Sequence, residues 1–281
     1  MTGVLRLLRP KQWVKNVLVA AAPLAAGTLF ERSTALSTLR TFAIFCMASS
    51  ATYAFNDVMD ADADARHSTK HRRPVASGAV PRWAALLLGA VLALVALVWA
   101  GSWQLRAVVG GYLVLTIAYS AYLKHQPVLE LGLVSAGFLL RAVAGGPATG
   151  IPISQWFLIV AAFGSLFMVS GKRLSELAAA TPEAPVTRKS LSAYPPSYLR
   201  LVLAISGGVT ITGYCLWAFE VGSSTLWATA SVAPFVLALL RYALDADLGR
   251  VEEPERVLLS DHVLQVLGAL WLGCFALAVA L

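Results

Sequence analysis

The apolar residues of this chain form nine long blocks, and this pattern constrains the fold more than any other feature. Each block is close to the ~20 residues that a helix needs to cross a bilayer. Strands of a membrane barrel would be shorter and would alternate polar and apolar side chains. The sequence therefore predicts an all-α, polytopic membrane protein with nine transmembrane helices. The blocks cover residues 14–30, 36–55, 83–101, 105–123, 127–147, 153–170, 199–219, 226–243 and 263–281.

Lys and Arg are distributed unevenly between the two sets of segments that connect these blocks. The set that contains the N-terminus and the loops 56–82, 171–198 and 244–262 carries 18 of them, counted over residues 1–15, 56–82, 124, 171–200 and 241–262, and the opposite set carries three. Because loops rich in Lys and Arg stay in the cytoplasm, we expect one transmembrane domain over residues 1–281, in the cell (inner) membrane, with its active site facing the cytoplasm. The net charge of +7 largely follows from this asymmetry. No nucleic-acid motif accompanies it, so we expect no nucleic-acid partner.

An acidic segment follows the second block directly, with the sequence Asn56-Asp57-Val58-Met59-Asp60-Ala61-Asp62-Ala63-Asp64. Each carboxylate would cost roughly 2.5–3.5 kcal/mol at the centre of a membrane helix, so the segment belongs at its polar end or in a water-filled cavity. On a continuous helix, Asp57, Asp60 and Asp64 would share one face. Mg²⁺ usually binds one or two carboxylates together with the oxygens of a phosphate substrate. The segment therefore predicts a metal–phosphate site at the membrane surface, with these three residues as Mg²⁺ ligands.

A basic segment continues from the acidic one and contains Arg66, Lys70 and Arg73. Cations next to metal-binding carboxylates can neutralise the remaining oxygens of a metal-bound diphosphate. The alternative interpretation is a solvated loop whose charges pair with one another and with lipid headgroups.

Two further polar groups lie at the ends of apolar blocks. Tyr119 and Lys124 end the fourth block, where they can act as an ordinary interfacial anchor or as part of a phosphate site. Lys172, Arg173 and Glu176 follow the sixth block. They are either a second anion site or a positively charged flank with an internal ion pair.

Arg141 differs from the other cations because it lies in the middle of an apolar block. An arginine at that depth needs a polar cavity or a partner, so we treat it as a functional residue. Glu130 precedes it on the same predicted helix by about three turns, which is too far for direct contact.

The acidic and basic segments together resemble the first Asp-rich motif of the UbiA superfamily of intramembrane prenyltransferases. The similarity lies in Asn56-Asp57-x-x-Asp60-x-x-x-Asp64 and in the residues that follow it, Arg66, Lys70, Arg73-Pro74 and Gly78. Tyr119 and Lys124 resemble the Tyr-x4-Lys element of the same superfamily. The resemblance implies a UbiA-like helical bundle, Mg²⁺ as cofactor, and Asn56 as a further metal or substrate ligand.

The chain departs from the superfamily after the sixth block. Typical members carry a second Asp-x-x-x-Asp motif there, whereas this chain has Gly171-Lys172-Arg173-x-x-Glu176. That variant, together with the segment from Arg9 to Asn16, is similar to a branch that transfers 5-phosphoribosyl from phosphoribosyl pyrophosphate to a polyprenyl (decaprenyl) monophosphate, for cell-wall arabinan precursor synthesis. The resemblance implies an Mg²⁺-dependent phosphoribosyltransferase that works in the lipid bilayer. Its catalytic and substrate-binding residues would include Lys15, Lys124, Arg141, Lys172, Arg173 and Glu176.

Two alternatives remain at this point. The first is a UbiA-type prenyltransferase with a prenyl diphosphate donor, which the missing second Asp pair disfavours. The second is a lipid-phosphate transporter, which should carry deep charges in several spans, whereas here only Arg141 is deep. The sequence does not decide the prenyl chain length or whether the chain forms a homo-oligomer.

Overall fold

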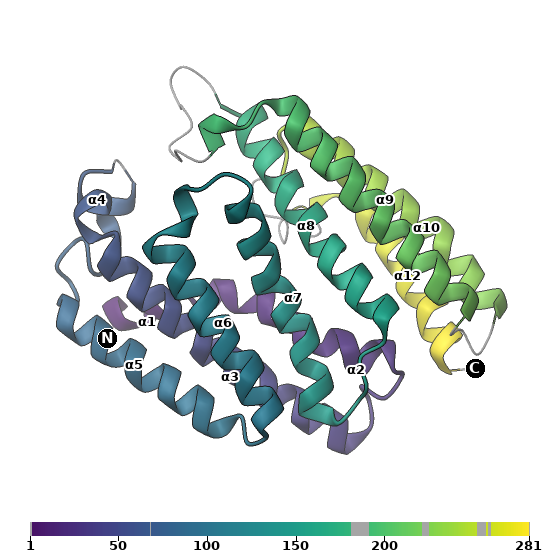
Figure 1. Ribbon diagram of the computed structural model, residues 1–281, viewed down its shortest axis with the longest axis horizontal. Coiled ribbons are helices and arrows are strands. Elements are labelled where there is room, and N and C mark those ends of the chain that lie inside the picture. Colours follow the sequence, from purple (N-terminus) through teal and green to yellow (C-terminus); the bar gives the residue numbers. More distant parts are fainter. Residues whose placement is uncertain are drawn as a thin grey trace. The chain divides into compact units, whose positions relative to one another are not determined.

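The computed structural model describes residues 2–67, 69–180, 191–220, 225–251, 257 and 260–280. Every regular element in these ranges is a helix (Figure 1), which confirms the all-α prediction. The chain divides into two compact units. The first contains Met1–Pro23, Leu29–Lys124 and Leu140–Pro152, and the second contains Leu24–Thr28, His125–Leu139 and Ile153–Leu281. The division passes through α7 (Leu129–Thr149).

The first unit is built around its longest helix, α3, which packs against α1, η1, α5 and α6. Small residues allow this close packing, because a Cβ atom on Gly89 of α5 would lie only 3.2 Å from the carbonyl oxygen of Ala51 on α3. Phe45 and Val109 lie in the buried core of this unit. Its elements are α1 (Thr2–Leu8), the 3-10 helix η1 (Pro10–Ala20), α3 (Arg32–Met59), α4 (Ala61–Ala65), η2 (Lys70–Arg72), α5 (Arg82–Trp99) and α6 (Trp103–Ala121).

The second unit contains four long helices that pack side by side, α8 with α9 and α10, and α10 with α9 and α12 (Figure 1). Gly171 of α8 permits a close approach to α10, since a Cβ atom there would lie 2.6 Å from the ring of Tyr242. The Tyr242 hydroxyl donates to the Met168 carbonyl oxygen at 2.9 Å. These contacts hold the end of α8 that carries Lys172 and Arg173. The helices are α8 (Gln155–Ala178), η4 (Leu191–Ala193), α9 (Pro196–Glu220), α10 (Thr225–Asp247) and α12 (His262–Ala280).

Eight of the nine predicted spans each correspond to one long helix, namely α3, α5, α6, α7, α8, α9, α10 and α12. Within the described residues, six helices are long and apolar enough to cross a membrane: α5, α7, α8, α9, α10 and α12. The chain is therefore a helical, multi-pass membrane protein by length and composition. The first predicted span, 14–30, does not form one helix. It is divided between η1 and the short α2 (Ala21–Ala25), and its apolar character is interrupted by Lys15 and Asn16.

The helices extend into segments that the sequence assigned to cytoplasmic loops. In the predicted loop 171–198, α8 continues to Ala178, residues 181–190 lie outside the described ranges, and α9 begins at Pro196. In the predicted loop 244–262, α10 continues to Asp247, and residues 252–256 and 258–259 lie outside the described part of the chain. The predicted loop 56–82 contains the last residues of α3 and the whole of α4 and η2. Hydropathy marks where a helix leaves apolar surroundings, which need not be where the helix ends. The prediction of a single domain over residues 1–281 stays a prediction.

Candidate functional site

The Asp-rich segment does not form one continuous helix. α3 ends at Met59, Asp60 takes a non-helical conformation with φ −92° and ψ 0°, and α4 follows at once. Backbone hydrogen bonds still bridge the break, because the Asp60 N–H donates to the Asn56 carbonyl oxygen at 2.9 Å and the Asp64 N–H to that of Asp60 at 2.8 Å. The expected spacing on a single helix face is therefore altered at Asp60.

Asp57 and Asp64 nevertheless converge on one point. Both are buried. Nη1 of Arg73 lies 2.6 Å from Oδ2 of Asp64 and 3.5 Å from Oδ1 of Asp57. The same Oδ1 of Asp57 also accepts a hydrogen bond from Nη2 of Arg9. Two carboxylates and two guanidinium groups thus form one cluster, which we call the Asp57 cluster.

Asp60 and Asp62 point to different partners. Asp60 pairs with Nζ of Lys124 at 2.5 Å, which brings the predicted Tyr-x4-Lys element to the Asp-rich segment. Lys124 is the central residue of the 3-10 helix η3 (Leu123–His125). Asp62 pairs with Arg82, and both side chains are exposed. The choice of Asp57, Asp60 and Asp64 over Asp62 as metal ligands stays a prediction.

The other residues of the first unit that the sequence predicted to bind metal or substrate differ in exposure. Asn56 and Tyr119 are half-buried, and so is Lys70 in η2, whereas Arg66 is exposed. Lys15 in η1 is half-buried, and its Nζ donates to Oε1 of Gln12 at 2.6 Å. Among the cations of this unit, the sequence interpretation missed Arg9 as a partner of Asp57.

The donor groups of the Asp57 cluster fit a hard divalent cation. Among the described residues, no three His, Cys, Asp or Glu side chains gather as a complete metal cage. Mg²⁺ does not require one, since it is usually held by one or two carboxylates plus phosphate oxygens and water. Asp57 and Asp64 supply such a pair of oxygen donors, and the two guanidinium groups that contact them show that positive charge is favoured here. A Mg²⁺ ion could be held there, with Asp60 close by along the chain.

Arg141 has the partners that its depth requires. It is buried in the part of α7 that belongs to the first unit. Its Nε donates to Oδ1 of Asn16 at 2.8 Å and its Nη2 to the Tyr112 hydroxyl at 2.7 Å. The Asn16 amide in turn donates to Oγ of Ser49 at 3.3 Å and lies 3.4 Å from Sγ of Cys46. This network ties α7 to η1 and α3, and a substrate-binding role for Arg141 stays a prediction.

In the second unit, Arg173 forms a buried ion-pair cluster with two glutamates. Its Nε and Nη2 donate to the two carboxylate oxygens of Glu130, both at 3.0 Å, and its Nη1 lies 3.0 Å from Oε2 of Glu176. The Arg173 side chain is 4% exposed and that of Glu130 is 0% exposed. Lys172 is more accessible, and its Nζ lies 3.9 Å from Oε1 of Glu176. The predicted internal ion pair is present, whereas Glu130 was not predicted as a member of the site.

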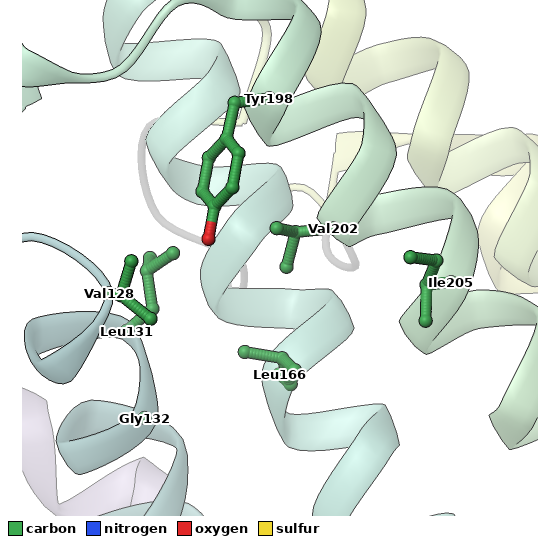
Figure 2. A pocket seen from close by; sticks show the side chains of 7 residues that line it. All are labelled: Val128, Leu131, Gly132, Leu166, Tyr198, Val202 and Ile205. Atoms are coloured by element: carbon green, nitrogen blue, oxygen red, sulfur yellow. The ribbon is translucent and has the colours of Figure 1, made fainter.

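A small apolar pocket of about 290 Å³ lies close to this cluster in the second unit. Figure 2 shows the Tyr198 hydroxyl pointing toward Val128 and Leu131. The pocket is lined by Val128, Leu131, Gly132, Leu166, Tyr198, Val202 and Ile205.

The backbone of Val128 is strained, with φ 67°, a value that β-branched residues rarely adopt. Its N–H donates to the Tyr194 hydroxyl at 2.5 Å, and the Tyr194 ring stacks on Tyr198 with centroids 5.6 Å apart. Burial raises the pKa of the Tyr194 hydroxyl above its ordinary value. Tyr194 thus fixes the chain just before Glu130.

A model of the UbiA prenyltransferase family matches residues 17–260 of the chain. The chain is 47% identical over 289 residues to a protein of Mycobacterium tuberculosis named decaprenyl-phosphate phosphoribosyltransferase, with 100% of this chain and 95% of that protein covered. It is 45% identical to the protein of the same name from Corynebacterium glutamicum, with 99% and 86% covered.

Among solved structures, a UbiA homolog from Archaeoglobus fulgidus bound to DMAPP and Mg²⁺ is similar, with a TM-score of 0.73, 17% identity and 99% of both chains covered. At that identity the likeness shows the fold alone. The two units described above therefore belong to a fold that is known from solved structures.

Proposed function

The chain belongs to the UbiA prenyltransferase family, and from this premise we propose that it transfers 5-phosphoribosyl from phosphoribosyl pyrophosphate to a polyprenyl monophosphate such as decaprenyl phosphate. It is a transferase, as its relatives with 45–47% identity over nearly the full chain are named phosphoribosyltransferases. The observation that carries the proposal in this chain is the Asp57 cluster. Its paired carboxylates suit a metal, and its guanidinium groups suit the phosphates of a donor.

We assign the donor to the Asp-rich segment. Asp57, Asp60 and Asp64, with Asn56, would hold Mg²⁺. A divalent ion there would stabilise the negative charge that develops on the leaving pyrophosphate. Arg73, Lys124 and the nearby Arg66 and Lys70 would bind the remaining phosphate oxygens.

The reaction breaks the bond between C1 of the ribose and the pyrophosphate oxygen and forms a bond between C1 and an oxygen of the lipid phosphate. Pyrophosphate leaves with the bonding electrons. The attacking phosphate monoester is already anionic at neutral pH, so the chain does not have to supply a general base. Its task is to orient the two phosphates for attack on C1 from the face opposite the leaving group, which gives inversion.

We assign the acceptor phosphate to cations outside the Asp57 cluster. Lys172 is the candidate for direct contact, because its side chain is 28% exposed. Arg173 and Arg141 are both buried and hydrogen-bonded to neighbouring side chains. We therefore propose that Arg173 supports the acceptor site by fixing α8 to the start of α7, and that Arg141 fixes α7 to η1 within the first unit through Asn16.

The direct test is a turnover assay with the purified full-length protein, Mg²⁺, phosphoribosyl pyrophosphate and polyprenyl phosphate. We expect release of pyrophosphate and formation of a lipid-linked phosphoribose, and we expect EDTA to abolish both. A parallel reaction in which a prenyl diphosphate and an aromatic acceptor replace the two substrates is the control. Product in the control reaction and none in the main reaction would reject the proposal.

We further propose nine spans, with the Asp-rich segment on the cytoplasmic side of the cell membrane. The support for this is the asymmetric distribution of Lys and Arg. Single cysteines at the exposed positions Ser77 and Ser192 should react with a membrane-impermeant thiol reagent only in inverted vesicles, and one at the exposed Ser102 only in intact cells. Labelling of Ser77→Cys in intact cells would reverse the orientation. The wild-type protein, whose three cysteines are buried or half-buried, serves as the background.

A further inference from the structure

We infer that Arg9 is an exchangeable counter-ion of Asp57. When a divalent metal binds through Asp57, the Arg9 guanidinium moves from that carboxylate to a phosphate of the donor, so that metal and donor bind cooperatively. This inference rests on the proposed function, because it concerns the same metal and diphosphate.

The backbone at Arg9 is held in an unusual conformation that directs the side chain to Asp57. Arg9 lies between α1 and η1 with φ 51° and ψ 59°, in the left-handed region that residues other than glycine seldom occupy. Its carbonyl oxygen accepts from the Gln12 N–H at 2.9 Å. Local strain of this kind persists where the surrounding structure requires it, and it is concentrated at functional sites.

The two members of this ion pair differ in burial. The Asp57 side chain is 1% exposed, whereas that of Arg9 is 25% exposed. The Arg9 guanidinium also lies over the ring of Tyr53, 4.8 Å from its centroid. A cation can keep that contact with the ring face while its hydrogen bonds change partner. Arg9 can therefore leave Asp57 without losing all of its contacts.

Competition for one oxygen atom explains why the exchange is needed. Oδ1 of Asp57 accepts from Arg9 and also lies 3.5 Å from Nη1 of Arg73. A metal ion that coordinates this oxygen must displace at least one of these cationic groups. Arg73 lies closer to Asp64, at 2.6 Å, than to Asp57, so Asp64 can hold it in place. Among the ion pairs described for this cluster, Arg9 contacts Asp57 alone and is therefore the group that a metal displaces.

Charge balance then couples the two ligands. A metal without a diphosphate would add positive charge beside a guanidinium group that has just lost its carboxylate. A diphosphate without a metal would place negative charge against the carboxylates. When both bind, the carboxylates face the metal and Arg9 faces a phosphate. Each ligand should therefore raise the affinity of the other by the same factor.

The test measures Mn²⁺ binding to the full-length protein by equilibrium dialysis, with free Mn²⁺ fixed by a metal buffer, in the presence and absence of phosphoribosyl pyrophosphate. In the wild type we expect the donor to tighten Mn²⁺ binding about ten-fold or more. In Arg9→Gln, Mn²⁺ should bind about three- to five-fold more tightly without the donor, because its competitor is gone. In this variant, addition of the donor should raise the affinity for Mn²⁺ by less than about three-fold.

Arg82→Gln is the matched control, since it removes an arginine from another Asp–Arg pair of the same segment, Asp62–Arg82. It should behave as the wild type does. Arg9→Lys keeps the charge but loses the guanidinium geometry, so its coupling should lie between the wild type and Arg9→Gln. If Arg9→Gln does not fold, Arg9→Lys carries the test.

Unchanged coupling in Arg9→Gln, or in Arg9→Lys where the former does not fold, would overturn the inference. Wild-type protein that binds Mn²⁺ and donor independently would also overturn it. Wild-type protein that binds Mn²⁺ under neither condition would instead reject the metal site of the proposed function, so the two failures are distinguishable.

Discussion

The Asp57 cluster and the cluster of Arg173, Glu130 and Glu176, which we call the Arg173 cluster, both pair carboxylates with guanidinium groups but differ in burial. In the first, the arginine side chains are 25% and 27% exposed, and they contact buried carboxylates. In the second, the arginine is 4% exposed and forms a two-pronged contact with Glu130, which is 0% exposed. An ion pair with a partly exposed member can exchange partners at low cost. Removing one member of a buried pair leaves an uncompensated charge.

This difference assigns different tasks to the two clusters. In the proposed function, the Asp57 cluster releases its cations to incoming phosphates and its carboxylates to a metal. The Arg173 cluster joins the start of α7 to the end of α8 within the second unit, and there Lys172 is the more exposed cation. We therefore expect substitutions in the Asp57 cluster to change activity, and substitutions in the Arg173 cluster to change stability first.

The largest effect should come from Asp57→Asn and Asp64→Asn. Each removes the charge of a proposed metal ligand while it keeps the size of the side chain, so turnover should fall by more than about a hundred-fold and the melting temperature should change little. Pyrophosphate release and thermal unfolding in detergent measure the two quantities. The control is Asp62→Asn, at a side chain that is 74% exposed, and it should retain nearly full activity. Equal losses in Asp57→Asn and Asp62→Asn would remove the distinction between the two carboxylates.

Glu130→Gln should have the next largest effect, on stability. It leaves the Arg173 guanidinium without its buried counter-charge, which should lower the free energy of unfolding by about 3 kcal/mol. Glu176→Gln, at a side chain that is 27% exposed, should cost less than about 1 kcal/mol. Denaturation followed by tryptophan fluorescence measures both. If Glu130→Gln proves as stable as the wild type but inactive, the Arg173 cluster resembles the Asp57 cluster in function and the comparison fails.

Lys172→Ala should have an intermediate effect that concerns the acceptor alone. A charge-assisted contact with phosphate contributes roughly 1.5–3 kcal/mol, so the KM for polyprenyl phosphate should rise about ten- to a hundred-fold. Donor binding, measured by calorimetry with Mg²⁺ and phosphoribosyl pyrophosphate, should stay nearly unchanged. If this variant instead loses affinity for the donor, Lys172 belongs to the donor site, and the assignments of the donor and acceptor phosphates must be exchanged.

The smallest effect should come from Tyr194→Phe. This substitution removes the hydroxyl that accepts from the Val128 N–H, next to a strained backbone. We expect a loss of about 1 kcal/mol in stability and a modest fall in turnover. Tyr198→Phe is the control, because it keeps the stacked pair of rings and the Tyr194 hydroxyl. A larger effect for Tyr198→Phe would mean that the Tyr198 hydroxyl in the pocket matters more than the hydrogen bond between Tyr194 and Val128.

Sequence alone was sufficient to predict a helical membrane protein and to identify the Asp-rich segment as a candidate site. Long apolar blocks predict helices because a backbone in lipid must satisfy its own hydrogen bonds. Carboxylates at the end of such a block can only be tolerated near water, which places the Asp-rich segment at the polar end of a span. Helical spacing then singled out Asp57, Asp60 and Asp64 within that segment. The family resemblance rested on this segment, on the basic segment that follows it, and on Tyr119 and Lys124.

Tertiary structure alone decided which polar and charged side chains meet and which of them are buried. Arg9 pairs with Asp57 across 48 positions, Arg173 with Glu130 across 43, and Arg141 with Asn16 across 125. Helix packing brings these residues together, and neither composition nor spacing along the chain predicts these pairs. The exposed fraction of an arginine is likewise a property of its neighbours in space. For that reason the sequence could predict cations at both clusters, but only the packed helices distinguish Arg9, which can exchange its partner, from Arg173, which is buried between two glutamates.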